Sequence, residues 1–235
     1  MELTEHTKGA IWIADYPVHY AGTRFNARMT VIRLADGRLI LHSPGDIDAA
    51  GAAQIAALGT PAFIVAPGSY HYLHVASAKA AFPGAEVWIC PGVERKAPDL
   101  QFDGFLSDTP PEAWAGELDQ CLLRGNRIVW EVAFFHRASK VLILTDLIEN
   151  IGDDTPGTDW TLKLWWKAVF HMWNHPKPAP EYQIGWSDKK AAKASLERIL
   201  DWDFDRIILA HGDLIDEDAK SVARQAWQRP LSWSG

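Results

Sequence analysis

The stretch Ala62-Phe-Ile-Val-Ala66-Pro67-Gly68-Ser69-Tyr70-His71-Tyr72-Leu73-His74 joins a short apolar run to a loop that holds two histidines. An apolar run that stops at Pro-Gly is typical of a strand buried on both faces of a sheet. A small helix over residues 75–81 and another strand over 86–90 are predicted to follow. In both halves of the chain, strands come first and then alternate with helices. This order predicts an α/β (α+β) architecture in which helices cover mixed sheets.

Residues of metal-ligand type follow four of the predicted apolar strands. They are His42 after 39–41, His71 and His74 after 62–66, Asp146 after 141–145, and His211 with Asp213 after 207–210. In open α/β sheets, ligands bind outside the carboxyl ends of the strands, so these side chains are expected to meet in one cleft. Imidazole nitrogens and a carboxylate suit zinc, iron or manganese. The sequence therefore predicts a metal-binding cleft.

Three of these segments resemble the metallo-β-lactamase superfamily. Residues 64–88 resemble its first metal motif, His-x-His-x-Asp-His, which opens a helix. The segment Lys140-Val-Leu-Ile-Leu-Thr-Asp146-Leu147 resembles the strand that carries its metal-bridging Asp, and Ile207-Ile-Leu-Ala-His211-Gly212 resembles the end that carries its last metal His. The order and spacing fit over residues 10–228. The resemblance implies a metallo-β-lactamase-like four-layer αββα sandwich with two mixed β-sheets.

The chain departs from the superfamily's pattern in ways that typify a divergent branch with an incomplete metal motif. Aligning His74 with the motif's last His puts Ser69 at its first His and Leu73 at its Asp. The superfamily also has a His before the strand that precedes the bridging Asp, and residues 125–131 contain none. More narrowly, the chain resembles an uncharacterised branch of the superfamily. Four segments carry this resemblance: His42-Ser43-Pro44, Phe134-Phe-His-Arg137, Thr145-Asp-Leu-Ile148 and Ala210-His-Gly-Asp213. A full two-metal site is not expected.

The remaining ligands predict a mononuclear site. One divalent metal, zinc first and iron or manganese as alternatives, is expected on His74, Asp146 and His211, with His71 as a fourth ligand or supporting residue. Three protein ligands plus water is the composition of an open, catalytic site. Asp213 or His42 could orient the ligands or accept a proton.

The predicted function is a metal-dependent hydrolase. Metal-activated water would attack a small ester, lactone, thioester or phosphoester, so that the partner is a small-molecule substrate. Two alternatives stay open: a catalytically inactive ligand-binding protein on the same fold, which Ser69 and Leu73 favour, and a mononuclear iron oxidoreductase, which uses the same types of ligand.

Composition narrows the class of protein. The chain has 235 residues and a net charge of −7, and it has no basic stripe of the kind that nucleic-acid-binding proteins show. No leader peptide and no apolar stretch of membrane-spanning length is evident, so a cytoplasmic location is expected. Cys90 and Cys121 are too few for a disulfide framework. Because both halves contribute ligands to one site, a single domain over residues 1–235 is expected.

One predicted helix, 159–174, is rich in tryptophan. Its apolar residues recur at helical spacing and form one face: Leu162, Trp165, Trp166, Val169, Phe170 and Trp173. This face could pack into the core, cover the site as a lid, form a homodimer surface, or lie on a membrane. The net negative charge and the presence of only two lysines in the segment make membrane binding the least favoured of these.

Overall fold

The side chains of β10, the strand Val141–Leu144, alternate between two hydrophobic cores. Val141 and Ile143 pack with residues of another sheet, whereas Leu142 and Leu144 pack under helices. Successive side chains on a strand point to opposite faces, so this alternation places the strand's sheet in the interior of the protein. Because both faces of β10 are buried, all four of its residues are apolar. The computed structural model of the chain describes residues 1–233.

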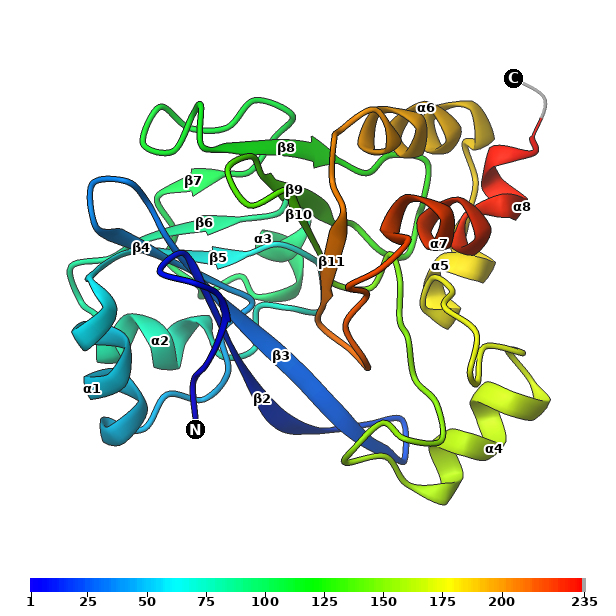
Figure 1. Cartoon of the computed structure of the whole chain (residues 1–235), viewed down its shortest axis with the longest axis horizontal. Coiled ribbons are helices and arrows are strands. Elements are labelled where there is room, and N and C mark those ends of the chain that lie inside the picture. The colour runs from blue at the N-terminus through cyan, green and yellow to red at the C-terminus, as the bar shows by residue number, and fades with distance from the viewer. Residues whose placement is uncertain (234–235) are drawn as a thin grey trace.

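The strands form two mixed sheets (Figure 1). The first sheet contains, in spatial order, β1 (Thr4–Thr7), β2 (Ile11–Tyr20), β3 (Thr23–Arg33), β4 (Arg38–His42), β5 (Thr60–Ala66), β6 (Glu86–Ile89) and β7 (Gly104–Phe105). The second contains β11 (Arg206–Leu209), β10, β9 (Val132–His136) and β8 (Leu118–Leu122) in that order. Strands β1 to β4 pair antiparallel and β4 to β7 pair parallel. In the second sheet, only β10 and β11 are parallel.

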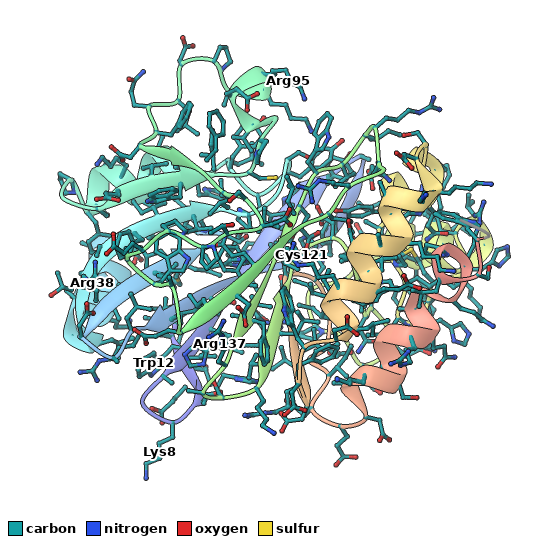
Figure 2. The ribbon with its side chains drawn as sticks, turned by 90° about the horizontal axis from the view of Figure 1, so that it is seen from above. Lys8, Trp12, Arg38, Arg95, Cys121 and Arg137 are labelled. Carbon is teal, nitrogen blue, oxygen red and sulfur yellow. The ribbon has the colours of Figure 1, made fainter. Side chains whose placement is uncertain are left out.

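Helices cover the outer faces of both sheets, which completes the four layers. Beside the first sheet lie α1 (Ala49–Leu58), α2 (Val75–Ala81) and the short α3 (Val93–Lys96), and beside the second lie α5 (Pro180–Gly185), α6 (Lys189–Leu200), α7 (Ala219–Ala226) and α8 (Gln228–Leu231). Figure 2 shows α6 and α7 next to each other on the side of the second sheet, and Cys121 of β8 near the middle of the view. The predicted αββα sandwich with two mixed sheets is confirmed.

The hairpin of β2 and β3 is longer than the sequence indicates. Only residues 11–14 are readily recognised as its first strand, yet pairing continues from Ile11–Ile32 to Tyr20–Thr23. The distal half of β2 is half-buried or exposed and lacks a continuous apolar run, which is why its strand character is hard to see. Its partner strand β3 contacts the fourth helix of the chain, α4 (Trp160–Ala168), and Val18 of β2 packs against the same apolar cluster.

Helix α4 is shorter than the predicted 159–174. It begins at the N-cap Asp159, whose side chain accepts a hydrogen bond from the Leu162 amide, and it ends at Ala168. His171 and Asn174 have φ values of +53° and +60°, which a helix cannot contain. Trp173 therefore reaches the core through a turn, and its amide donates to the carbonyl oxygen of Trp166.

The described residues, 1–233, include no helix whose length and apolar character would allow it to cross a bilayer.

Candidate metal centre

Three polar side chains converge from three strand ends. His71 lies in the loop after β5, Asp146 follows β10, and His211 follows β11. Because β10 and β11 are adjacent and parallel, their carboxyl ends meet at one edge of the second sheet. The loop after β5 brings His71 to that edge from the first sheet. The centre therefore lies where the two sheets meet.

The metal-ligand atoms of these residues all lie within 4.8 Å of one another. Oδ1 of Asp146 is 3.2 Å from Nε2 of His71 and 3.4 Å from Nε2 of His211. All three side chains are buried, and the centroids of the two imidazole rings are 5.2 Å apart. Two imidazole nitrogens thus face one carboxylate oxygen from different sides.

Neighbouring groups fix the orientation of both imidazoles. Nδ1 of His211 donates to the carbonyl oxygen of Asn26 at 3.1 Å, because a carbonyl can only accept. In the neutral ring, Nε2 then keeps a lone pair for a ligand, as in many metal-binding histidines. Nδ1 of His71 is 2.7 Å from the hydroxyl of Ser43, which is itself buried with φ at +54°. That left-handed backbone at a non-glycine residue is strain of the kind found at functional sites.

The charges of the three groups are interdependent. Burial disfavours ionisation of Asp146, but the facing imidazoles of His71 and His211 outweigh it and hold the pKa of Asp146 well below its ordinary value. Burial likewise disfavours a charged His211, yet the hydrogen bond and charge of Asp146 raise the pKa of His211. Asp146 is therefore a carboxylate that attracts positive charge, whether a proton on an imidazole or a metal ion.

Glu131 holds the backbone that carries Asp146. It directly precedes β9 and is fully buried. Its two carboxyl oxygens accept the amides of Thr145 at 2.6 Å and of Asp146 at 2.9 Å. Burial, together with the charge of Asp146, raises the pKa of Glu131. This side chain lies in the region where the resemblance leads one to look for a histidine, and it supports the site through the backbone.

Arg28 of β3 fastens the His211 turn to the first sheet. Its Nη1 donates to the carbonyl oxygens of Leu209 at 2.7 Å and Gly212 at 2.9 Å, and its Nη2 donates to Asp15 at 3.0 Å. Gly212 has a φ of +90°, and a Cβ there would lie 2.0 Å from the carbonyl oxygen of Asn150. Only glycine fits this turn without displacing the chain, so the turn presents His211 in one position.

A cavity of about 430 Å³ includes all three residues in its lining. This volume is within the range of small-molecule sites, about 300–1,000 Å³. The cavity also includes Glu149, a buried residue whose carboxyl accepts a hydrogen bond from the indole of Trp166 at 3.1 Å. Burial raises the pKa of Glu149 to about 8. A carboxyl that stays protonated at neutral pH can donate a hydrogen bond into the cavity.

The structure brings together three of the four predicted metal ligands. His74 lies outside the cluster of donor atoms, although it contributes to the cavity lining. It sits at the N-terminal boundary of α2, and its ring packs edge-on against Tyr16. The sequence-based hypothesis gave His74 a principal position and His71 a supporting one, whereas the geometry of the described residues favours the reverse.

The two further candidates for catalysis face elsewhere. His42 is buried with its ring edge-on to Phe134, it is absent from the cavity lining, and burial lowers its pKa to about 3. Asp213 is exposed and accepts a hydrogen bond from the hydroxyl of Thr155 at 2.6 Å. It joins the His211 turn to the loop that holds Thr155, and it does not line the cavity.

Of the two residues at the departures from the motif, Ser69 has a structural role, and Leu73 lies exposed beside the cavity. Ser69 is buried, and its hydroxyl accepts the amide of Trp130 at 3.2 Å, so it joins two loops. Leu73 is 69% exposed and lies on the lining of the cavity. Neither side chain offers a metal ligand. Neither Glu131 nor Glu149 is predicted as a site residue from the sequence. Each is an acidic residue inside or beside an apolar run, and this is the signal that could have identified it.

The donor set fits a single divalent metal. Ligand atoms placed tetrahedrally at about 2.0–2.1 Å from zinc lie about 3.3 Å from one another, close to the two separations involving Asp146. Two histidines and one carboxylate occur both in catalytic zinc sites and in mononuclear iron sites with open positions. His71, Asp146 and His211 are thus suited to hold such an ion and to leave part of its coordination sphere to water or substrate.

Comparison with known proteins gives a family match and a fold. The family described as "Domain of unknown function (DUF4336)" matches residues 8–181. No curated protein matches the sequence.

Several solved structures are similar over nearly the whole chain. A metallo-beta-lactamase from Pontibacter korlensis has a TM-score of 0.65 at 14% identity, covering 97% of this chain and 99% of that one. The metallo-beta-lactamase FIM-1 from Pseudomonas aeruginosa, in its mono-zinc form, has a TM-score of 0.66 at 12% identity and covers 99% and 96%. A metallo-beta-lactamase from Hirschia baltica has a TM-score of 0.66 at 11% identity and covers 97% of each. These similarities show the metallo-β-lactamase fold.

Proposed function

Because the chain belongs to the DUF4336 family and has the metallo-β-lactamase fold, we propose that it is a metal-dependent hydrolase of a small ester-type substrate. One divalent metal would be held by His71, Asp146 and His211. The observation that carries this proposal is the convergence of two Nε2 atoms on Oδ1 of Asp146 in the lining of a ligand-sized cavity. Zinc is the first candidate, with iron or manganese as alternatives.

The proposed reaction adds water across the acyl bond. A bound divalent metal would lower the pKa of water and polarise the substrate carbonyl. The oxygen of water bonds to the carbonyl carbon, the bond to the leaving oxygen or sulfur breaks, and the leaving atom takes up a proton. Asp146 and the two histidines supply the ligand field, while Glu131 and Arg28 hold their backbone in place. The protonated carboxyl of Glu149 is placed to donate a hydrogen bond to substrate.

The proposal is tested with an uncharged chromogenic ester, 4-nitrophenyl butyrate. We expect wild-type protein to release 4-nitrophenol, and His211→Ala to fall to the rate of chelator-treated protein. The control is His175→Ala, which removes an exposed imidazole that does not line the cavity. Turnover that survives both chelation and His211→Ala would contradict a metal-dependent reaction at this site.

A mononuclear iron oxidoreductase is the second candidate, and one observation favours it. The cluster contains two histidines and one carboxylate, the ligand combination of non-haem iron oxygenases. Iron in protein purified under anaerobic conditions, with no ester turnover, would support this candidate over hydrolysis. A catalytically inactive binding protein would give neither hydrolysis nor oxygen consumption, and it would still bind ligands in the cavity.

A further inference from the structure

The two histidines of the candidate metal centre have hydrogen-bond partners of different kinds. Nδ1 of His211 meets the carbonyl oxygen of Asn26 at 3.1 Å, whereas Nδ1 of His71 meets the hydroxyl of Ser43 at 2.7 Å. A carbonyl oxygen can only accept a hydrogen bond, but a hydroxyl can either donate or accept one. The partner of His211 therefore requires a proton on Nδ1, while the partner of His71 suits either tautomer of the ring.

Without metal, Asp146 decides which nitrogen of His71 carries the proton. Its Oδ1 is 3.2 Å from Nε2 of His71. Despite its burial, Asp146 is held as a carboxylate by the imidazoles that face it, which lower its pKa. A carboxylate accepts and cannot donate, so Nε2 of the neutral His71 ring carries the proton. Nδ1 is then a bare lone pair, and the hydroxyl of Ser43 donates to it.

A metal ion on His71 requires the opposite arrangement. Histidine binds a metal through a nitrogen without a proton, so a metal on Nε2 leaves the single proton of the neutral ring on Nδ1. The hydroxyl of Ser43 must then accept, and its own proton needs an acceptor.

Tyr16 can supply that acceptor. Its hydroxyl donates to the carbonyl oxygen of Pro44 at 3.5 Å, which leaves the lone pairs of the phenol oxygen available. Burial raises the pKa of Tyr16 to about 12, and a hydrogen bond with Ser43 acts against this rise. A hydrogen bond lowers the pKa of an acid when it is donated to the ionised form. The hydroxyl of Ser43 can therefore point to Tyr16 when it accepts from His71.

The backbone at Ser43 disfavours a residue with a side chain. Ser43 is buried and has a φ of +54°, in the left-handed region that glycine adopts most readily. Its amide donates to the carbonyl oxygen of Val65 at 2.9 Å, which holds it at the end of β4 beside β5. Glycine would relieve the strain but has no hydroxyl. The hydroxyl is thus the feature that this strained position supplies to the site.

We propose that Ser43 is a positioning residue that allows His71 to change tautomer when the metal binds. Its hydroxyl donates to Nδ1 in the metal-free protein and accepts from Nδ1 in the metal-bound protein. The ring stays neutral throughout, because one proton leaves Nε2 for solvent and one is added to Nδ1 from solvent. The proposal rests on the proposed function for the metal at Nε2 of His71. Loss of such a partner typically weakens metal binding about 10–100-fold.

Nitrogen NMR of the histidine rings tests the tautomers directly. In isotope-labelled, chelator-treated protein, we expect the His71 ring to carry its proton on Nε2. After addition of zinc chloride, we expect the proton on Nδ1. The His71→Ala variant identifies the signals of this ring by their absence. A ring that carries its proton on Nδ1 both without and with zinc would overturn the proposal.

Two substitutions separate the hydroxyl of Ser43 from its backbone. Ser43→Ala and Ser43→Gly both remove the hydroxyl, but only glycine relieves the left-handed strain. Both should weaken zinc binding about 10–100-fold in competition with a chelating dye. Urea unfolding of the metal-free variants should find Ser43→Gly at least as stable as Ser43→Ala. Wild-type zinc affinity in Ser43→Gly would show that only the backbone matters at this position, against the proposal.

Ester turnover distinguishes this proposal from the proposed function. If zinc binds and the His71 proton moves, but 4-nitrophenyl butyrate is not hydrolysed, the role of Ser43 stands and the hydrolase fails. If the metal-bound protein hydrolyses the ester with no change of tautomer, the hydrolase stands and the role of Ser43 fails. A protein that binds no divalent metal would overturn both.

Discussion

At the scale of single residues, Glu149 is a buried carboxyl group with an unusual pKa. Burial raises its pKa from 4.5 to about 8, because the carboxylate form loses its hydration. The unfolded chain releases this proton near pH 4.5, whereas the folded chain retains it up to about pH 8. Folding therefore takes up a proton between these values, and the contribution of Glu149 to stability is lost as pH rises through them.

The first prediction concerns Glu149→Gln, which keeps the shape and the acceptor for Trp166 but cannot ionise. The free energy of unfolding of the variant relative to wild type should rise between pH 5 and pH 8, by at most about 1.4 kcal/mol for each pH unit. Urea unfolding at both pH values measures it. Glu217→Gln, at an exposed position, should give a difference that does not vary with pH. A constant difference for Glu149→Gln as well would contradict the assignment.

At the same scale, the two histidines of one loop illustrate what a sequence conveys. His71 and His74 are three residues apart, and each is a histidine in a loop after a strand, so either could be a metal ligand. The backbone decides between them: His71 is held by the hydroxyl of Ser43, while His74 lies at the start of α2 with its ring against Tyr16. Ser43 comes from the end of another strand, so no local pattern could have identified this partner.

At the scale of elements, α4 divides its tryptophans between interior and solvent. Leu162 and Trp166 are buried with Phe25, Ile151 and Trp173, as the packing alternative for this helix predicted. Trp165 and Val169 of the same predicted face are 48% and 50% exposed. At the start of the helix, Asp159 accepts the amides of Leu162 and Arg24 and so ties this end to β3. Because Trp165 and Val169 are exposed, the helical spacing of the apolar residues overestimates the width of the buried face.

A matched pair of substitutions on α4 gives the second prediction. Trp166→Ala should lower the free energy of unfolding by about 3–5 kcal/mol, because it empties a packed position. Trp160→Ala, at a residue that is 75% exposed, should change it by no more than about 0.5 kcal/mol. Urea midpoints of the two variants measure the difference. Similar losses for both would mean that α4 presents a different face to the core.

The homodimer expected through this helix stays a prediction. Trp160, Leu164, Trp165 and Val169 are exposed apolar residues of the kind that such a surface would need. Sedimentation equilibrium checks it, since Leu164→Glu should dissociate a dimer formed here. A wild-type protein that sediments as a monomer would contradict it.

At the scale of the whole molecule, much of the fold can be predicted because its strands are locally encoded. The turn Asp36-Gly37, the apolar runs at β5, β10 and β11, and the helix α2 are each determined by residues close in sequence. The length of the β2–β3 hairpin is not determined locally. Its distal half depends on pairing between the two strands and on contact with α4. Local patterns report local preferences, and pairing between distant segments can override them.

The candidate site follows the same rule. Its location at strand ends is predictable, because parallel strands place their carboxyl ends together. Its supporting contacts are not, because Arg28 reaches Leu209 and Glu131 reaches Asp146 across the fold. Such long-range hydrogen bonds leave no periodic trace in a sequence.

The central claim is that His71, Asp146 and His211 hold one divalent metal, and elemental analysis of protein purified without chelator tests it most directly. We expect about one equivalent of metal per chain in the wild type, its loss in His71→Ala and in His211→Ala, and its retention in His74→Ala. Circular dichroism of each variant would confirm that the fold persists. A wild-type protein that binds no zinc, iron or manganese, or that keeps its metal without His71 and His211, would contradict the account.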